Sequence, residues 1–427
     1  MAEIKAFDAL RYTEKAGKLD ELVCPPYDII SEEERKAFLA RNPRNVIRLE
    51  LPREGENPYI EAGDTLREWL AEEYLACDDK PGLYIYEEEF TAHGQRMTIK
   101  GLICRARLEP FEKGVVLPHE ETLSKAKTDR LNLMKATGCN FSSIYSLYFD
   151  EKKDIFPRLE ALSQGEPDKT FSLGDDIIHR LWAVYDEAEI AAVEAAFGDK
   201  KLYIADGHHR YETALNYKNW LKEQGELALT SDSHPANYCM MTLVNMENPG
   251  LVVFPTHRIV RGLDNFDPEA LLAGCGKYFR VEDAAPDALE SKLAEYTAKG
   301  QKAFALYYKG GAKLLVFTDG EIMKELLPGT SEAYQGLDVN ILHTLILERL
   351  LGIDKENMAN QKNLIYTRDP AEAMAAVNSG EADCAFLIEA TRVEEIAAVA
   401  GAGEKMPQKS TYFYPKIVTG HIMNKIL

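Results

Sequence analysis

The sequence lacks the patterns that mark several common classes of protein. Its seven cysteines are scattered, odd in number and contain no Cys-x-x-Cys pair, which argues against a disulfide framework and against a zinc site. No run of about 18 apolar residues occurs, and the start "MAEIKAFDALRY" has no apolar signal core. We therefore expect a soluble, cytoplasmic protein with reduced cysteines.

Motifs for the common nucleotide-binding and hydrolytic sites are also missing. The sequence contains no G-x-x-x-x-G-K-[ST] loop, no G-x-G-x-x-G turn after an expected strand, and no G-x-S-x-G elbow. The glycines of "GAGEKMP" do not qualify, because a proline follows where a helix should begin. A nucleotide site in this chain must therefore be of another kind.

Positive charge is scarce relative to negative charge. The 50 Lys and Arg residues face 70 Asp and Glu residues, which gives a formal net charge of −20. This excess repels nucleic acid and anionic membranes, so neither is expected as a partner. A small anionic ligand can still bind in a locally positive pocket. The oligomeric state is left open.

Strands and helices alternate along the chain, but antiparallel hairpins interrupt the alternation. The runs "GLYIYEEEFTAHG" and "RMTIKGLICRARLE" predict a β-hairpin. "SEEERKAFLARN" predicts a helix with a capping box of Ser31 and Glu34, and "LVVFPTHRIV" predicts a strand. We expect mixed α/β or α+β domains with mixed sheets, not one doubly wound sheet. A change of pattern divides the chain into an N-terminal α/β region, 1–264, and a C-terminal α+β region, 265–427, whose tail can return to the pocket.

The stretch "KLYIADGHHRYETAL", 201–215, has polar and cationic residues where an expected strand gives way to an expected helix. Gly207 tolerates positive φ and so permits a sharp turn. The N-terminus of a helix attracts anions, and the guanidinium of Arg210 suits a phosphate. His208 and His209 can add hydrogen-bond donors or a proton shuttle. We predict a phosphate or nucleotide site here, with helix capping and a metal site as the alternatives.

The motif "DGHHRYETA" resembles the glycine-turn motif of the ParB/sulfiredoxin superfamily, which includes partition-protein nucleotide switches, sulfiredoxins and an archaeal-type free serine kinase. Gly207 and Arg210 match the Gly-x-x-Arg pattern of partition proteins. Sulfiredoxins carry a reactive cysteine at the position of His208, so their chemistry is not implied. The resemblance implies a ParB/sulfiredoxin-like unit around this turn.

The segment "HEETLSKAKTDR", 119–130, is a dense ionisable run before an expected helix. Lys125 and Arg130 can bracket phosphates, and His119 is a further ligand-binding candidate. Asp129 or Glu120 can hold magnesium or accept a hydroxyl proton. The alternative is a solvated charged loop. The stretch "CNFSSIYSLY" downstream instead favours a loop anchored to a sheet, where binding sites are common.

The C-terminal stretch "PQKSTYFYPK" alternates basic and aromatic residues. A nucleic-acid site is disfavoured by the net charge, whereas a terminal strand can donate Lys409 or Ser410 to the pocket. In "VFPTHRIV", Arg258 lies within an otherwise apolar strand. A buried guanidinium needs either a salt-bridge partner or a ligand, and both interpretations stay open.

Four blocks together resemble a bacterial and archaeal family known as domain of unknown function 1015. These blocks are "CPPYDIIS", "HEETLSKAKTDRLNLMKATGCNFSSIYSLYFD", "ADGHHRYETAL" and "MPQKSTYFYPKIVTG", in the order expected for the family. The resemblance spans nearly the whole chain. Members are often encoded beside serine-biosynthesis genes and are often labelled serine kinases or nucleotide-binding proteins, so the resemblance implies such an activity.

We therefore predict an ATP- or ADP-dependent phosphotransferase, assisted by Mg²⁺, that acts on a small hydroxyl substrate such as free serine. The catalytic candidates are carboxylates and histidines: Asp206, His208, His209, Asp129 and Glu120. The residues predicted to bind the nucleotide are Gly207, Arg210, Lys125, Arg130, His119 and Lys409. One alternative is a non-catalytic nucleotide-binding regulator related to partition proteins. The other is a metal-dependent hydrolase that uses the histidine pair, although no complete set of metal ligands is assigned.

Overall fold

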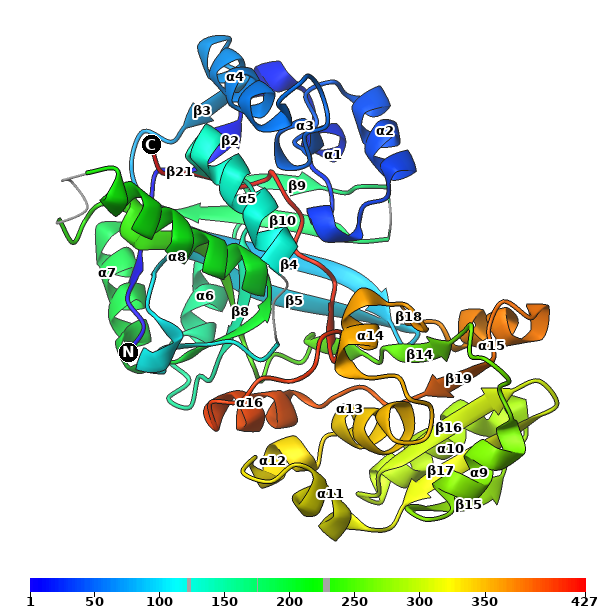
Figure 1. The fold of residues 1–427 in the computed structure, drawn as a ribbon. Helices are drawn as coiled ribbons and strands as arrows, with labels where there is room; N and C mark the ends of the chain where they lie inside the picture. The colour runs from blue at the N-terminus through cyan, green and yellow to red at the C-terminus, as the bar shows by residue number, and fades with distance from the viewer. Residues whose placement is uncertain (121–123, 175, 226–230) are drawn as a thin grey trace. The chain divides into compact units, whose positions relative to one another are not determined.

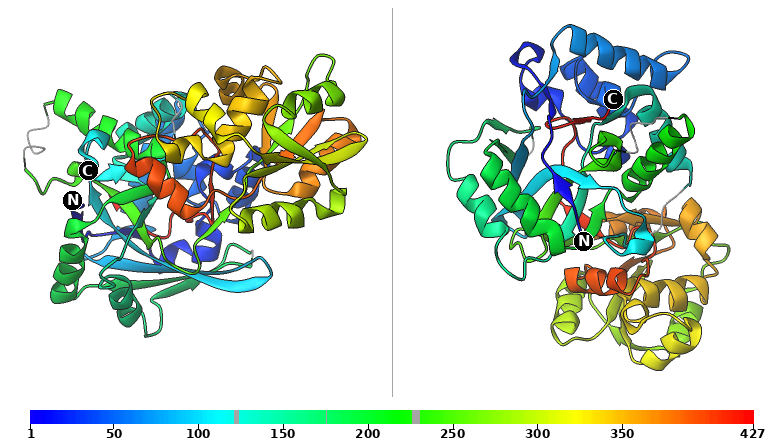
Figure 2. Two further views of the ribbon diagram at one scale, coloured as in Figure 1. Left: turned by 90° about the horizontal axis from the view of Figure 1, so that it is seen from below. Right: turned by 90° about the vertical axis from the view of Figure 1, so that its left-hand side faces the viewer.

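The computed structural model describes residues 1–120, 124–174, 176–225 and 231–427, and it describes side chains in helix α5 from residue 127 onward. The chain forms two compact units. Unit 1 consists of Met1–Pro118, Thr122–Val252 and Pro415–Leu427, and unit 2 consists of His119–Glu121 and Val253–Tyr414. Both chain ends therefore belong to unit 1 (Figure 1; Figure 2). The division into regions at residue 264 stays a prediction.

Unit 1 is built on a mixed nine-stranded sheet. Its strands, in order across the sheet, are β6 (Val116–Leu117), β11 (Leu202–Asp206), β8 (Ile144–Tyr148), β12 (Tyr238–Asn245), β5 (Gln95–Arg107), β4 (Leu83–Ala92), β10 (Ile178–Val184) and β9 (Lys169–Phe171), with β1 (Ile4–Lys5) paired to β5. The β6–β11 and β8–β12 pairs are parallel, whereas the other pairs are antiparallel. The prediction of a mixed sheet with antiparallel hairpins is confirmed.

The predicted hairpin is the β4–β5 pair, in which Ala92 lies opposite Gln95. The two residues between them, His93 and Gly94, have φ of 50° and 71°. Two successive positive φ values match the twist that short hairpins favour, and a glycine in the second position supplies one of them at little cost. The local sequence therefore determines this register.

The described part of unit 1 contains eight α-helices. They are α1 (Leu19–Leu22), α2 (Glu32–Arg41), α3 (Ile47–Glu50), α4 (Pro58–Ala71), α5 (Ser124–Thr137), α6 (Phe156–Leu162), α7 (Glu187–Ala196) and α8 (His208–Glu223). The predicted capping box is confirmed, since Ser31 and Glu34 bond reciprocally at the start of α2. Two short ladders pair β2 (Leu10–Tyr12) with β3 (Leu75–Cys77) and β7 (Cys139–Asn140) with β21 (Asn424–Lys425).

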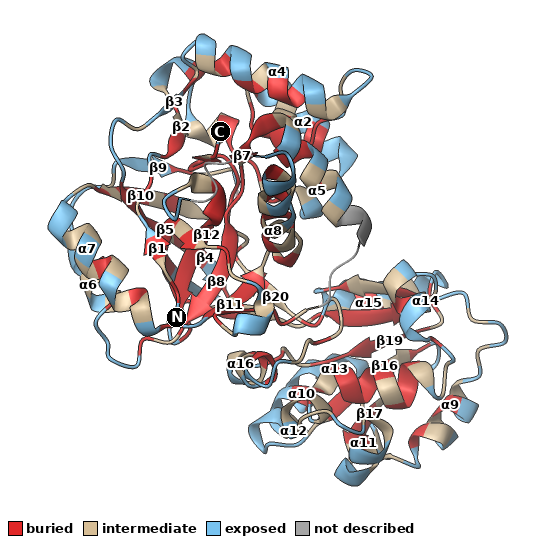
Figure 3. Cartoon of the chain, turned by 60° about the vertical axis from the view of Figure 1, so that its left-hand side comes forward, coloured by how far each residue is buried: buried red, intermediate tan, exposed pale blue. Residues whose placement is uncertain are grey.

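Buried residues concentrate in the central strands of unit 1, while α4 and α7 present exposed faces (Figure 3). Helices α5 and α8 lie against each other (Figure 1). Tyr211 and Tyr217 of α8 and Met134 of α5 enter the same apolar core as the strands. Lys127 donates to Glu212 over 2.7 Å and ties the two helices together. This packing brings the two motif-bearing helices to one place.

Unit 2 contains an antiparallel six-stranded sheet. Its strands, in order, are β15 (Phe279–Asp283), β17 (Gly311–Phe317), β16 (Ala303–Tyr308), β19 (Cys384–Leu387), β14 (His257–Val260) and β18 (Leu364–Thr367). Its α-helices are α9 (Pro268–Cys275), α10 (Leu289–Ala298), α11 (Gly320–Leu326), α12 (Glu332–Gln335), α13 (Asp338–Ile341), α14 (Lys355–Asn360), α15 (Pro370–Ser379) and α16 (Val393–Gly401). A π-helix, Leu342–Glu348, continues directly from α13.

The stretch expected as one strand, "LVVFPTHRIV", forms two strands instead. Strand β13 (Val252–Phe254) pairs with β20 (Tyr412–Tyr414), and β14 begins at His257 in the six-stranded sheet. The prediction of a single strand is wrong, because Pro255 has no N–H to donate to a ladder and separates the two pairings. Among the described helices, none combines the length and hydrophobicity needed to cross a lipid bilayer.

Candidate functional site

The turn at Gly207 joins β11 to α8 and has the predicted form. Gly207 has φ of 94°, and the 16-residue helix begins at the next residue. A Cβ atom at this position would lie 2.8 Å from Nε of Arg210, so a side chain there would force Arg210 to move and would also strain the backbone. Among the described residues, no side chain caps the start of this helix. The partial positive charge of the helix terminus is therefore not offset by a capping group.

Asp206 ends β11 and binds two cations. One carboxylate oxygen accepts from Arg210 and the other accepts from Lys416, which lies near the C-terminus of the chain. Burial alone would raise the pKa of Asp206, but the charges of Lys416 and Arg210 outweigh it and lower that pKa well below its ordinary value. Asp206 is thus held ionised and orients both cations.

The backbone around Asp206 is irregular in a way that aims its side chain. The register between β11 and β8 shifts between Ile204 and Asp206, and Asp206 lies opposite Tyr145. Such a bulge re-aims side chains at the end of a strand. On the facing segment, the carbonyl oxygen of Ser143 accepts from Arg210 over 2.5 Å. Arg210 is therefore fixed from two sides.

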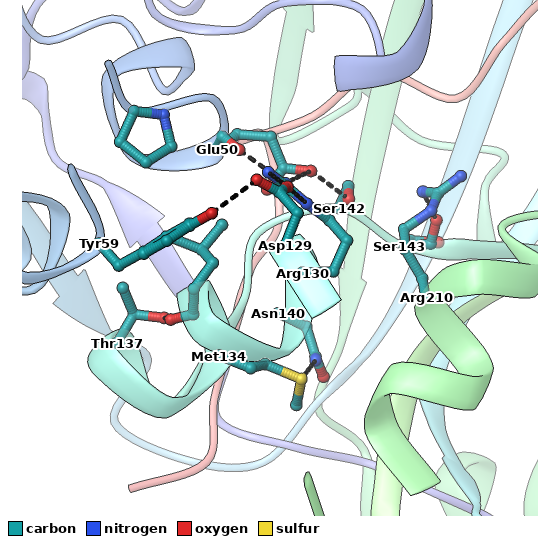
Figure 4. Close-up of polar contacts among 12 residues, drawn as sticks. Glu50, Tyr59, Asp129, Arg130, Met134, Thr137, Asn140, Ser142, Ser143 and Arg210 are labelled. Carbon is teal, nitrogen blue, oxygen red and sulfur yellow. Dashed lines mark hydrogen bonds and ion pairs between the residues drawn. The ribbon is translucent and has the colours of Figure 1, made fainter. Parts of the chain in front are cut away.

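Arg130 of α5 is the centre of a second ion-pair group (Figure 4). Its guanidinium donates to Asp129 over 2.6 and 2.8 Å and to the backbone oxygen of Glu50 over 2.6 Å. The Glu50 carboxylate lies 3.7 Å away, and the Tyr27 ring centroid lies 4.1 Å from the guanidinium carbon. Asp129 also accepts from Tyr59 over 2.8 Å. Arg130 is only 4% exposed, so these partners compensate for a buried charge.

Glu50 is a buried carboxylate in this group that sequence analysis missed. It ends α3, is 3% exposed, and accepts from the hydroxyl of Ser142 over 2.8 Å. Burial raises the pKa of Glu50, although Arg130, Ser142 and Arg210 act in the opposite direction. The pKa of Glu50 is therefore closer to neutral pH than the pKa of Asp206.

A small cavity of about 40 Å³ lies between the two motifs, and both Arg130 and Arg210 line it. Glu50 and Ser142 also line it. So does Thr213 of α8, whose buried hydroxyl has no hydrogen-bond partner among the described residues. Because a water molecule needs roughly 10–15 Å³ by this measure, the cavity can hold a few waters or one small polar group. The segments around Arg130 and Arg210 thus line one cavity.

The other predicted residues lie in different settings. His208 is buried at the start of α8 and His209 is half-buried. Within the described ranges, no three His, Cys, Asp or Glu side chains are grouped so that they can hold a metal ion. The side chain of Lys125 lies outside the described residues.

His119, Glu120 and Lys409 belong to unit 2. Nε2 of His119 is 2.8 Å from the Thr411 hydroxyl, and Glu120 accepts from the same hydroxyl over 3.2 Å. Lys409 is exposed, and its backbone oxygen accepts from Arg258 over 3.2 Å. Their predicted roles at the nucleotide stay predictions.

Lys416 is the second residue of the site that was not predicted to bind. The C-terminal tail was expected to contribute Lys409, whereas Lys416 is the lysine that contacts Asp206. The block "MPQKSTYFYPKIVTG", used above for the family resemblance, contains both lysines. This block indicated that the tail contributes to the site, but it did not indicate which of the two lysines contacts Asp206.

The chain matches the model of one protein family over most of its length. A family model described as "Protein of unknown function (DUF1015)" matches residues 4–340, so the chain belongs to this family. No match was found among curated proteins.

Three solved structures show low similarity to the chain. A conserved hypothetical protein from Pyrococcus furiosus has 16% identity and a TM-score of 0.34, with 74% of this chain and 92% of that chain covered. Free serine kinase in complex with AMP has 15% identity and a TM-score of 0.35, with 73% and 86% covered. SbnI with a C-terminal truncation, from Staphylococcus aureus, has 7% identity and a TM-score of 0.35, with 75% and 86% covered.

Proposed function

We propose that this chain is a nucleotide-dependent phosphotransferase that transfers a phosphoryl group to a small hydroxyl substrate such as free serine. The observation that carries the proposal is the shared carboxylate of Asp206. It orients Arg210 and Lys416 beside the N-terminus of α8, and Arg210 faces the same cavity as Arg130. Phosphoryl transfer depends mainly on positioning and on charge stabilisation, and this arrangement offers both.

Arg210 and Lys416 are the proposed phosphate ligands. A guanidinium offers paired donors that match phosphate oxygens, and a lysine adds a compact charge. Gly207 leaves the helix N-terminus uncovered, so the backbone can approach an anion closely. Because Asp206 already holds both cations, a phosphate would bind to groups that have lost most of their rotational freedom.

Glu50 is the proposed proton acceptor for the substrate hydroxyl. A general base works best when its pKa lies near the working pH, and burial moves the pKa of Glu50 in that direction. Asp206 has a strongly lowered pKa and is committed to two cations, so it suits a positioning role. Asp129 suits a positioning role for the same reason as Asp206. Arg130 overcomes the effect of burial and lowers the pKa of the Asp129 carboxyl.

The volume of the cavity and the charges around it limit how a nucleotide, ATP or ADP, and Mg²⁺ can bind at this site. A space of about 40 Å³ accommodates one phosphate group at most, so the nucleoside has to lie outside it. Among the described residues, ion pairs around the cavity join three cations to three carboxylates: Arg130, Arg210, Lys416, Glu50, Asp129 and Asp206. Mg²⁺ usually binds one or two carboxylates together with substrate phosphates. It would therefore arrive with the nucleotide, and Asp129 is the carboxylate suited to meet it.

The test is direct detection of product. The full chain is incubated with Mg²⁺, free serine and either ATP or ADP, and phosphoserine is measured by mass spectrometry. A parallel thermal-shift titration reports nucleotide binding, because a ligand that binds only the folded state raises the melting temperature. We expect both signals. If nucleotide binds but neither serine nor another small alcohol is phosphorylated, a nucleotide-binding regulator is the better interpretation. If no nucleotide causes a thermal shift, both the phosphotransferase and the regulator are excluded.

A further inference from the structure

A second and larger pocket lies entirely within unit 2. Its volume is about 340 Å³, compared with about 40 Å³ for the cavity beside Arg210. Its walls come from α11, α12, α13, the π-helix and α14, with Tyr366 of β18 and Pro407 and Gln408 from the C-terminal segment. Pockets for small organic molecules usually measure about 300–1,000 Å³. Unit 2 therefore contains the space for an organic ligand.

The π-helix forms one wall of this pocket and is unusual in itself. It runs for seven residues, Leu342–Glu348, in direct continuation of α13. Helices of this type are rare because their geometry is less favourable than that of an α-helix, and they often occur at functional sites. Leu342, Leu345 and Ile346 are fully buried in the interior, whereas His343 and Thr344 line the pocket. The widened turn thus presents polar groups to the pocket while its apolar residues stay packed.

His343 is a buried polar residue without a partner on one nitrogen. It is 4% exposed, and its Nε2 atom has no hydrogen-bond partner among the described residues. Burial lowers the pKa of His343 well below its ordinary value, and the positive charges of Arg258 and Lys355 act in the same direction. The ring is therefore neutral and retains unused hydrogen-bonding capacity at the pocket wall.

The lining of this pocket carries more positive than negative charge although the whole chain is acidic. Arg349 and Lys355 stand exposed on it, and Glu348 is the one acidic residue among its described residues. Behind it, Arg258 is fully buried with Nε unpartnered among the described residues, and its guanidinium carbon lies 5.5 Å from the centroid of the Tyr366 ring. Charges of one sign at a concave apolar site attract small counter-ions.

Apart from Asn340 and Gln408, the remaining lining is apolar or aromatic. Leu326 and Leu327 come from α11 and the residue after it, Met358 and Ala359 from α14, and Tyr366 from β18. A pocket with an apolar body and a few convergent polar groups selects for a ligand with the same division. The charges of the lining leave an excess of one positive charge, which suits a monoanion better than a phosphate dianion.

We propose that this pocket binds a small monocarboxylate with an aromatic or branched apolar body. The carboxylate lies toward Lys355 and Arg349, and the apolar body packs on Tyr366, Leu326 and Met358. This site belongs to unit 2 and does not depend on the function proposed for Asp206 and Arg210.

Ligand-detected NMR with the full chain tests the site. The probes are phenylacetate, indole-3-acetate and 4-methylvalerate, with phenylacetamide as the neutral analogue and phenyl phosphate as the dianion. We expect at least one carboxylate to bind with a Kd of about 1 mM or tighter, and its amide to bind at least about tenfold more weakly. The absence of carboxylate binding, or equal or stronger binding of the amide or the phosphate, would overturn the proposal.

Two variants locate the binding. Ala359→Trp fills the pocket and should abolish binding, whereas Ala371→Trp, at an exposed position of α15, should leave it intact. Lys355→Glu reverses a charge on the lining and should weaken binding at least about tenfold, whereas Lys362→Glu, on an exposed lysine outside the pocket, should not. Thermal unfolding confirms that each variant is folded. Retained binding in folded Ala359→Trp and in Lys355→Glu would show that the carboxylate binds elsewhere and would overturn the assignment.

Discussion

Lys416 and Asp206 form an ion pair between residues that are 210 positions apart in the chain. The pair joins the C-terminal segment of unit 1 to the end of β11, where Asp206 also binds Arg210. One carboxylate therefore fixes two cations that come from distant parts of the sequence. The Asp206 carboxylate already holds the two donors, Arg210 and Lys416, in position. If a phosphate binds at this point, it accepts from these donors either in place of the carboxylate or together with it.

Replacing Lys416 tests whether the tail contributes to nucleotide binding. We expect Lys416→Gln to weaken binding of ATP or ADP at least about tenfold, equivalent to about 1.4 kcal/mol, because a charge-assisted contact to phosphate is lost. Isothermal titration calorimetry measures the change. Lys409→Gln is the matched control, since Lys409 is exposed and belongs to unit 2. A loss of affinity with Lys409→Gln alone would favour the original sequence-based choice.

The contrast between these two lysines shows what sequence patterns can and cannot predict. The turn at Gly207 was predicted because an apolar strand, a glycine and a helical pattern are adjacent in the chain. Which lysine pairs with Asp206 depends on which part of the C-terminal tail lies beside the end of β11. No local sequence pattern predicts that tertiary contact. The tail was predicted to contribute Lys409, and that role stays a prediction; the lysine that contacts Asp206 lies seven residues further along the chain.

Gly207 should be essential to the geometry of the site. Gly207→Ala places a side chain at φ of 94° and a Cβ atom 2.8 Å from Nε of Arg210. We expect the free energy of unfolding to fall by about 1–3 kcal/mol and nucleotide binding to be lost, because Arg210 must move away. Urea denaturation and the thermal-shift titration measure the two effects.

Gly198→Ala provides the control for this glycine. Gly198 is not at positive φ, and a Cβ atom there would meet nothing within 4 Å. This substitution should be neutral or should stabilise the fold by up to about 1 kcal/mol, because it restricts the unfolded chain. Equal stability and equal nucleotide binding in Gly207→Ala and the parent protein would contradict the role given to the turn.

Glu50 should affect chemistry more than binding. We expect Glu50→Gln to lower the rate of phosphoserine formation by about 10²–10⁴-fold while nucleotide affinity changes little, because only the proton acceptor is removed. Ser142 can still donate to the amide oxygen, so the local packing is retained. Glu61→Gln, at an exposed position of α4, is the control and should keep full activity.

The pH dependence of the reaction gives a second, independent readout on Glu50. A proton acceptor works only when it is ionised, so the rate should rise with pH through the raised pKa of Glu50 and then level off. The rising limb should disappear in Glu50→Gln. A normal rate and an unchanged pH profile in this variant would exclude Glu50 as the base.

There is a physical reason why the sequence did not predict Glu50 as a site residue. It lies between Leu49 and Leu51 in an apolar run, and nothing in its neighbours distinguishes it from a surface carboxylate at a helix end. Its burial is imposed by Arg130 and Ser142, which are about 80 to 90 positions away. Arg130 itself was identified because it lies in a dense charged run. The sequence therefore indicated the cation of this group and its neighbour Asp129, but not Glu50.

His421 has a setting that predicts acid sensitivity of unit 1. It is 2% exposed, and its ring stacks on Tyr86 with a centroid separation of 4.5 Å. Burial and the neighbouring His179 lower the pKa of His421 to about 3. In the unfolded chain the imidazole has its ordinary pKa of about 6.5. The neutral ring therefore contributes its full stability above pH 6.5, and this contribution is lost progressively as the pH falls from about 6.5 towards 3.

Replacing His421 by phenylalanine should reduce this loss, because Phe keeps the aromatic contact with Tyr86 and cannot take up a proton in the unfolded state. Each pH unit below 6.5 costs up to about 1.4 kcal/mol per such histidine, so the difference in unfolding free energy between pH 6.5 and 4.5 should be about 2 kcal/mol smaller in His421→Phe. Urea denaturation at both pH values measures it. His93→Asn is the control, since His93 is exposed in the β4–β5 turn and asparagine tolerates its positive φ. The same acid loss in His421→Phe and the parent protein would show that His421 is not responsible for the acid sensitivity.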